Sequence, residues 1–361
     1  MLHDLILEIL SRLPFRSVCR FKCVSVPWRD LISDPANRKT LPQTLAGFLF
    51  TTRNGGGAWM HHFAGLPFPS SPAPVDPSLP FLKQNKYKYI YHVDSVNGLV
   101  LSAFFSKETP PVDEDEFGYV VCNPATDRWI ELPPQPWANT SDARLAFDPA
   151  VSSHFHVVKI CENILGVENY VTGVDIFSSR TGAWIHGDSR LVEKFQVFDW
   201  RRSVFFGGML HLFGRLKPSK ESALLVVDME GKTWKTICLP GYSDCGAIEV
   251  SQGCLYYATT TRAYVNIKIN FLATEIKLWC LENYERKEWV LKHSVSIDEP
   301  LSIIPGGCGV FAIHPDCDTV FLVTCARDTL VAYDMQQRKF VHIRNHLKGK
   351  FREYLPYVPL F

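Results

Sequence analysis

The chain opens with residues 1–35, MLHDLILEILSRLPFRSVCRFKCVSVPWRDLISDP, and this stretch predicts a compact helical module. Apolar residues at positions 2, 5, 6, 9, 10 and 13 recur at spacings of three and four, which is typical of one face of a helix. Pro14 ends that helix, because proline lacks a backbone N–H and disfavours a helical residue before it. A second amphipathic piece follows over residues 15–24, and Pro27 opens a third helix that runs to residue 32. Three such short helices bury little surface, so the module needs a partner, either the rest of the chain or another protein.

These residues resemble the F-box. The segment DLILEILSRLP at 4–14 matches the family's first helix and its terminating Leu-Pro, and VCRFKCVS at 18–25, WR at 28–29 and LISDP at 31–35 match the rest in order and spacing. The resemblance implies docking onto the Skp-family adaptor of a cullin-RING ubiquitin ligase. Family members usually begin with Leu-Pro just before the acidic pair, where this chain has Met1-Leu2-His3. The alternative interpretation is an ordinary helical cap on the downstream domain.

The resemblance also implies which residues dock onto the adaptor or support the docking surface. They are ten apolar or proline residues spread over the three expected helices, namely Leu5, Ile9, Leu10, Leu13, Pro14, Val18, Phe21, Val24, Trp28 and Leu31. Some of them must form the module's own core, and the sequence does not sort the two sets. We expect this adaptor-binding module to occupy residues 1–40 and a second, substrate-binding domain to occupy residues 41–361.

The composition narrows the class of protein. Of the 361 residues, 46% are hydrophobic and 21% charged, and the net charge is +1, so no strong field recruits nucleic acid or an anionic membrane. The N-terminus lacks the basic start and small-residue cleavage site of a signal peptide, and no apolar run is long enough to span a bilayer. Eleven cysteines, an odd number, lie mostly on apolar segments and predict reduced core side chains. We therefore expect a cytoplasmic and/or nuclear protein.

A repeat with a period near 50 residues runs through the rest of the chain. Short β-type runs are followed by a polar turn and then an aromatic residue, as in YVVCN at 119–123, VDIFS at 174–178 and LVVD at 225–228. The aromatic residues are separated by 55, 50, 55 and 51 positions and are Trp129, Trp184, Trp234, Trp289 and Phe340. About four strands per period indicate the blades of a kelch-like all-β propeller. The segments NPATDRW at 123–129 and AFDP at 146–149 also resemble plant F-box-associated interaction domains.

The sequence indicates the kind of repeat more directly than it indicates the number of blades. Five units are clear, and an earlier fragment over residues 48–52 and 59–63 lies one period upstream and supplies a sixth. The C-terminal stretch, residues 351–361, can pair with that fragment and close the ring, which removes exposed sheet edges. We therefore predict about six blades, with five or seven left open and a β-sandwich array as the alternative fold. The periodic aromatic residues are predicted to pack between blades.

No catalytic constellation is found, and we predict no enzyme activity, no cofactor and no metal. His154 and His156 point to one side of a strand but lack a third ligand, whereas His61 and His62 face opposite ways. GYSDC at 241–245 begins like a nucleophile elbow but lacks the closing glycine, which predicts a loop between blades.

The expected function is that of a substrate-recognition subunit of an SCF-type (Skp-cullin-F-box) ubiquitin ligase. The F-box would bind the adaptor, and through it the cullin and RING subunits, while the propeller binds an unidentified target protein. Irregular segments near residues 102–117, 137–142, 217–221 and 259–266 are the candidate target contacts. One alternative is a propeller interaction protein whose degenerate F-box recruits no ligase. The other is a propeller enzyme, which would need convergent carboxylates or a metal set.

Overall fold

The computed structural model describes most of the chain. The residues outside the description are 1, 12, 14–17, 19–20, 35–36, 38–44, 54–58, 67–74, 83–85, 107–116, 136–142, 164–168, 199–200, 242–245, 265–270, 297–307, 325–328, 345–349, 352–353 and 360–361. The predicted domain boundary at residue 40 falls in one of these gaps and stays a prediction. No helix in the described ranges is long and apolar enough to cross a bilayer.

Two helices are described in the N-terminal module: α1 (Leu2–Ser11) and α3 (Val26–Ser33). The Ser25 side chain caps α3 by accepting a hydrogen bond from the backbone N–H of Trp28 at 3.4 Å, and Pro27 lies in the first turn, where it loses no helical hydrogen bond. Half of the expected middle helix, residues 15–17 and 19–20, lies outside the described residues. Val18 and Phe21 within it are helical, whereas residues 22–24 form a turn.

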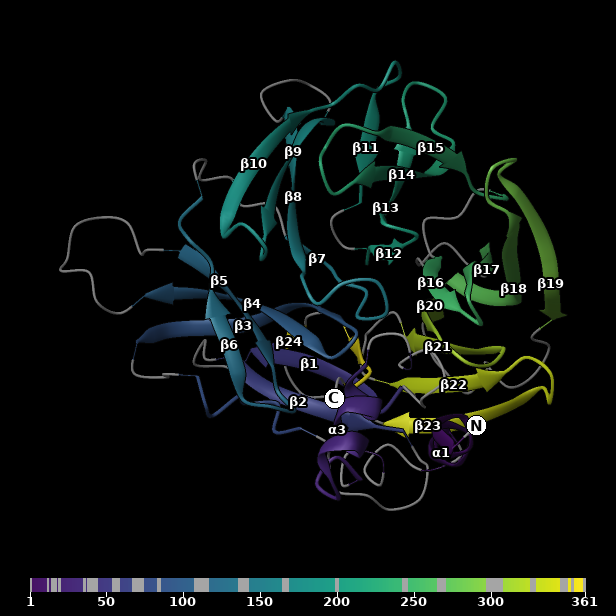
Figure 1. The fold of residues 1–361 in the computed structure, drawn as a ribbon. Helices are drawn as coiled ribbons and strands as arrows, with labels where there is room; N and C mark the ends of the chain where they lie inside the picture. The colour runs from purple at the N-terminus through teal and green to yellow at the C-terminus, as the bar shows by residue number, and fades with distance from the viewer. Residues whose placement is uncertain are drawn as a thin grey trace.

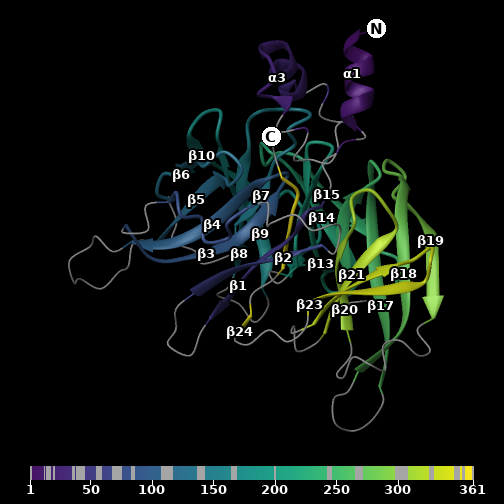
Figure 2. The ribbon, with the colours of Figure 1, turned by 90° about the horizontal axis from the view of Figure 1, so that it is seen from below.

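The helical module has a small core of its own. Leu10, Val18 and Ile32 are fully buried, and five partly buried residues pack around them, namely Ile6, Leu7, Leu13, Phe21 and Trp28. The rings of Phe21 and Trp28 are 5.1 Å apart between centroids. Figure 2 shows α1 and α3 outside the ring of sheets, on one side of it.

The described strands form six antiparallel sheets arranged as the blades of a propeller (Figure 1). Blade 1 contains β1 (Gly47–Arg53), β2 (Trp59–Gly65), β24 (Lys350–Phe351) and β25 (Leu355–Tyr357). Blade 2 contains β3 (Tyr87–Val96), β4 (Leu99–Ser106), β5 (Phe117–Asn123) and β6 (Arg128–Glu131). Blade 3 contains β7 (Arg144–Ala146), β8 (His156–Asn163), β9 (Tyr170–Ser178) and β10 (Ala183–Asp188).

The second half of the ring repeats this arrangement. Blade 4 contains β11 (Phe195–Val197), β12 (Val204–Phe206), β13 (Met209–Leu216), β14 (Ser222–Asp228) and β15 (Trp234–Cys238). Blade 5 contains β16 (Ala247–Ser251), β17 (Cys254–Tyr264), β18 (Phe271–Asn283) and β19 (Glu288–Ser296). Blade 6 contains β20 (Cys308–Ile313), β21 (Thr319–Thr324), β22 (Leu330–Asp334) and β23 (Lys339–Arg344). The propeller prediction is confirmed, and the number of blades is six.

Pairing between the two ends of the propeller sequence closes the ring. In blade 1, Gly47 of β1 is opposite Tyr357 of β25, and Thr52 is opposite Phe351 of β24. The other neighbour of β1 is β2, in a hairpin that runs from Gly47 opposite Gly65 to its turn. The predicted sixth unit and its pairing with the C-terminal strand are therefore both confirmed.

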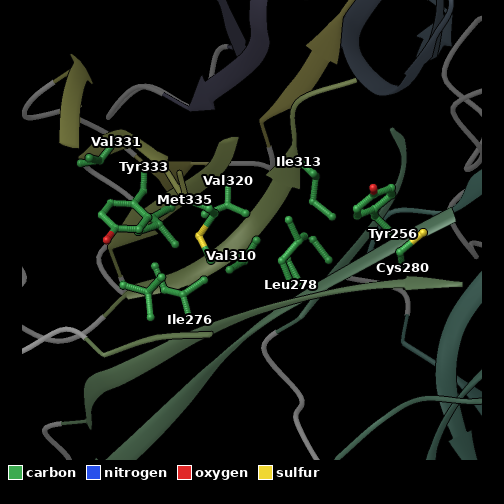
Figure 3. Close-up of a cluster of buried hydrophobic side chains, with 14 residues drawn as sticks. Tyr256, Ile276, Leu278, Cys280, Val310, Ile313, Val320, Val331, Tyr333 and Met335 are labelled. Carbon is green, nitrogen blue, oxygen red and sulfur yellow. The ribbon is translucent and has the colours of Figure 1, made fainter. Parts of the chain in front are cut away.

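Hydrophobic cores lie between neighbouring blades, one at each of the six interfaces. Figure 3 shows the core between blades 5 and 6, where Leu278 and Tyr256 of one blade meet Val320 and Ile313 of the next. Middle strands are therefore buried on both faces: Phe48 packs toward blade 6, and its neighbour Leu49 packs toward blade 2. This two-sided burial explains why the strand sequences are continuous apolar runs rather than alternating ones.

Each periodic aromatic residue is the first or second residue of the outermost strand of its blade. Each is opposite a residue near the end of the preceding strand, as with Trp129 opposite Cys122 and Trp234 opposite Val227. The turn between the two strands holds one residue with positive φ, at Asp127, Gly182, Gly231, Lys287 and Arg338. An Asn, Asp or Ser side chain at the start of each turn accepts a backbone N–H, as Asp334 does from Gln336 at 2.9 Å. The repeated turn chemistry is thus the physical source of the sequence period.

Two of these tryptophans join neighbouring blades by a hydrogen bond. The indole N–H of Trp184 donates to the carbonyl of Pro133, and that of Trp289 donates to the carbonyl of Cys238, each at 3.0 Å. Trp234 instead bonds within its own turn, to the carbonyl of Gly231 at 2.9 Å. All are half-buried against an inter-blade core, so the predicted packing role is confirmed.

Candidate adaptor-docking and target-binding surfaces

The structure divides the ten predicted adaptor-docking residues by burial. Leu5, Ile9 and Val24 have exposed fractions of 61%, 59% and 60%. Leu10 and Val18 are fully buried in the module's core. The remaining described residues are intermediate, namely Leu13, Phe21, Trp28 and Leu31, and Pro14 lies outside the described residues.

Helix α1 contributes residues both to the exposed apolar surface and to the core of the module, because apolar residues cover more than half of its circumference. Leu5 and Ile9 are four residues apart and share a face of α1, whereas Leu10 lies on the face that packs against the core. Val26, at the first position of α3, is 58% exposed and was not predicted. We call Leu5, Ile9, Val24 and Val26 the open apolar set. Their exposure in a module with its own core is what a docking surface requires.

The ring has two faces that differ in their connections. Because neighbouring strands are antiparallel, strand ends alternate between the faces. One, the turn face, carries tight hairpins such as Asn97-Gly98 and Gln252-Gly253, with positive φ at each of these residues. The start of β1, where the chain enters from the helical module, and the end of β25 lie on this face as well. The opposite side, the connection face, carries the links between the second and third strands of each blade and the links that leave blades 2 to 6.

The four predicted target-contact segments cover or lie within the links that join β4 to β5, β6 to β7, β13 to β14 and β17 to β18. The strand ends that flank these links lie at the connection face. Three predicted bounds were wrong: residues 102–106 belong to β4, Phe117 belongs to β5, and residues 259–264 belong to β17. Threonines at 259–261 are β-branched and fit a strand despite their polarity. Residues 217–221 are described throughout, whereas 107–116, 137–142 and 265–266 lie outside the described residues.

A buried charge network joins the innermost strands near the axis of the ring. The Arg202 guanidinium, before β12, forms an ion pair with Glu249 of β16 and lies 3.9 Å from the carboxylate of Asp94 in β3. Asp94 also accepts the backbone N–H of Leu145 at 2.9 Å. Burial raises the pKa of Glu249, and the Arg202 charge opposes that effect. These contacts connect four blades and are explained by assembly of the ring.

The histidines noted in the sequence do not form a site in the described part of the chain. His62 stacks on Phe50, with centroids 4.9 Å apart, whereas His61 packs against His92 at 4.6 Å, so adjacent histidines do face opposite ways. His156 is half-buried, and burial lowers its pKa. Among the described residues, neither His154 nor His156 joins a group of three metal-ligand side chains. The elbow-like segment at 241–245 lies, apart from Gly241, outside the described residues.

One group with metal-ligand chemistry was missed by the sequence analysis. Cys161, Asp175 and His186 lie on three successive strands of blade 3, and their ligand atoms are within 4.8 Å of one another. Their separation along the chain is 14 and 11 residues, a spacing that matches no metal motif. Only the strand register brings them together, so no local signal could have revealed them.

Comparison with known proteins gives two matching family models. The model described as F-box protein At3g26010-like, beta-propeller, matches residues 61–353, and the F-box domain model matches residues 3–40. The putative F-box/kelch-repeat protein At1g15680 of Arabidopsis thaliana is 24% identical, with 93% of this chain and 82% of the relative covered. The F-box protein At3g26010 of the same plant is 26% identical, with coverage of 92% and 76%.

Proposed function

The chain belongs to the family of F-box proteins with an At3g26010-like β-propeller, and from this premise we propose that it is the substrate-recognition subunit of an SCF-type ubiquitin ligase. Its F-box binds a Skp-family adaptor, which links it to the cullin and RING subunits. Its propeller holds a target protein for ubiquitination. In this role the chain needs no catalytic group of its own, because binding two partners at once is sufficient to raise the effective concentration of the target near the charged enzyme.

The open apolar set is the observation that carries this proposal. Leu5 and Ile9 are about 60% exposed although Leu10, next to Ile9, is fully buried in a separate core. Fully burying such a side chain contributes about 1.5–3 kcal/mol, so burying the exposed part contributes about 1–2 kcal/mol for each residue. Leu5 and Ile9, four residues apart on α1, are spaced as the anchors of a helix-in-groove contact with a partner.

The placement of the two surfaces supports the same function. The helical module joins the ring at the turn face, through the start of β1. The four candidate target segments leave the ring at the connection face. An adaptor docked on the module therefore leaves the connection face open to a target.

Adaptor binding by the full chain tests the proposal. A purified Skp-family adaptor should be retained by the wild type. Leu5→Asp combined with Ile9→Asp should weaken its binding by about 100-fold or more, because the two side chains together contribute about 2–4 kcal/mol and each about 1.4 kcal/mol changes the affinity tenfold. Val192→Asp is the matched control, because Val192 is fully exposed on the propeller and its substitution should leave adaptor binding unchanged.

Thermal unfolding separates a binding defect from a folding defect. Leu5→Asp with Ile9→Asp should leave the unfolding temperature unchanged, whereas Leu10→Ala should lower the stability of the module by about 2–5 kcal/mol. Equal adaptor binding by the folded double variant and the wild type would overturn the docking assignment. Absence of binding by the wild type would leave the alternative function, a propeller interaction protein that recruits no ligase.

We also propose that the protein acts in the cytoplasm and/or the nucleus. The seven cysteines described by the structure are all free thiols, which fits a reducing compartment. A fluorescent fusion of the full chain, imaged beside nuclear and secretory markers, tests this placement, and signal confined to the secretory route would contradict it.

A further inference from the structure

Three side chains of blade 3 that commonly bind metals converge on one face of the sheet. Asp175 of β9 is at the centre: its Oδ2 lies 3.5 Å from the Cys161 Sγ on β8, and its Oδ1 lies 2.7 Å from the His186 Nδ1 on β10. Asp175 is 6% exposed, and the side chain of His186 is 48% exposed. The cluster thus has a buried inner side and an accessible outer side.

Strand register explains the convergence. Asp175 is directly opposite both His186 and Lys159, and Cys161 lies two residues beyond Lys159 on the same face. The residue opposite Cys161 is Gly173, where an added Cβ would lie 3.2 Å from the His186 ring and 2.7 Å from a backbone carbonyl oxygen. The glycine therefore leaves the space beside the three ligands open.

We propose that Cys161, Asp175 and His186 bind a zinc ion. A thiolate, a carboxylate and an imidazole are all zinc ligands, and their bonds of about 2.0–2.3 Å place tetrahedral donor atoms about 3.3–3.8 Å apart. The Cys161 sulfur lies 3.5 Å from one oxygen of Asp175, and the His186 Nδ1 lies 2.7 Å from the other, so coordination by a single carboxylate oxygen requires shifts of about 1 Å. Because its side chain is half-exposed, His186 is the ligand that would move.

A second carboxylate lies beside the other nitrogen of the imidazole. The other ring nitrogen of His186, Nε2, lies 3.3 Å from the Asp188 carboxylate. A carboxylate that accepts the N–H of a ligating histidine fixes which nitrogen faces the metal. The three ligands leave a fourth coordination position for water or for a group from a bound protein.

The charges at the site add up to zero with the ion present. Cys161 as a thiolate, Asp175 and Asp188 contribute three negative charges, the ion contributes two positive charges, and the buried Lys159 contributes one. The Cys161 thiol lies 3.5 Å from the Asp175 carboxylate, and a zinc ion that binds there would displace the thiol proton. An ion would then tie together the three strands of blade 3 that face blade 2, since Trp184 on the same face of β10 bonds to blade 2.

Cobalt substitution of the full chain tests the proposal. After chelator treatment, addition of Co²⁺ should produce a thiolate-to-cobalt charge-transfer band and four-coordinate visible bands with one equivalent bound, and Zn²⁺ should displace them. Cys161→Ser should abolish the charge-transfer band, and His186→Ala should weaken binding at least tenfold. Cys238→Ser removes an exposed thiol elsewhere and should change nothing.

Two further measurements keep the result decisive. The metal-free variants should have the unfolding temperature of the metal-free wild type, and Zn²⁺ should raise that temperature in the wild type and in Cys238→Ser but not in Cys161→Ser. Asp188→Asn should lower the affinity about 10–100-fold while the charge-transfer band persists at saturation. Absence of a charge-transfer band in the wild type, or an unchanged band in Cys161→Ser, would show that the cluster is only a hydrogen-bonded group and would overturn the proposal.

Discussion

Acidification should destabilise the propeller at the interface of blades 1 and 2, where two imidazoles are buried against each other. The ring centroids of His61 and His92 are 4.6 Å apart. The Nδ1 of His92 is 3.0 Å from the hydroxyl of Ser102, and its Nε2 is 3.0 Å from the carbonyl of Pro77. Burial lowers the pKa of His61 to about 4 and that of His92 to about 3. Both side chains are therefore neutral in the folded protein at ordinary pH.

The sign of the pH effect follows from those pKa values. In the unfolded chain both histidines bind protons below their ordinary pKa of 6.5, whereas the folded chain resists protonation down to about 4 and 3. The stability is complete above about pH 6.5 and falls as the pH decreases through that value. At about pH 5 each histidine costs about 2 kcal/mol, so the pair costs about 4 kcal/mol relative to about pH 7.5.

Urea unfolding followed by tryptophan fluorescence measures this loss. His61→Gln removes one titrating group and should reduce the difference between the two pH values by about 2 kcal/mol. The exposed His342→Gln is the control and should keep the full difference. His211, whose pKa burial lowers to about 4, contributes separately and is present in both variants. Equal pH dependence in His61→Gln and the wild type would refute the reasoning.

Three further predictions concern the packing of the ring. Gly214→Ala should destabilise the protein by more than about 3 kcal/mol, because the added Cβ would lie 2.1 Å from a backbone carbonyl oxygen. In the control Gly65→Ala the nearest neighbour of the added Cβ is 3.6 Å away, so its free energy of unfolding in urea should be within about 1 kcal/mol of the wild type. Equal stability of the two variants would contradict this prediction. Arg202→Met should lower the free energy of unfolding by about 3–5 kcal/mol, because it leaves the buried Glu249 without its guanidinium partner. Adding Glu249→Leu should recover most of that loss in the same urea titration. If the effects of the two substitutions simply add, the prediction is wrong. Trp184→Phe should cost about 1 kcal/mol in thermal unfolding, since it removes the hydrogen bond to blade 2 but keeps an aromatic ring, and an unchanged unfolding temperature would count against that role.

Local features made most of the propeller predictable. The turn before each periodic aromatic residue uses an Asn, Asp or Ser side chain to cap the backbone, and this leaves a signature in the sequence. The residue with positive φ leaves a signature in three of the five turns, at Asp127, Gly182 and Gly231. The sixth blade was predicted from weaker evidence, because its pairing joins residues near 50 to residues near 355. Such pairing depends on the whole ring and has no local signal.

Burial and register were the parts that the sequence did not determine. Leu5, Ile9 and Leu10 are all aliphatic residues of one short helix, and only its packing decides that Leu10 is buried while the other two are exposed. The cluster of Cys161 and its two partners depends on which residues are opposite each other across two strand pairs. A shift of one residue in either pair would move a ligand to the other face of the sheet.

Ring closure also explains why the docking module and the candidate target segments lie on opposite faces. Blades 2 to 6 each have four strand positions, so the connections that leave these blades and those between their second and third strands gather on one face. A chain that entered the ring at an innermost strand would enter at that same face. Here the innermost position of blade 1 is filled by the C-terminal strands β24 and β25, so the chain enters at the second position, through β1, from the turn face. The C-terminal strand thus does more than remove a sheet edge: it places the helical module and the candidate target segments on opposite faces of the ring.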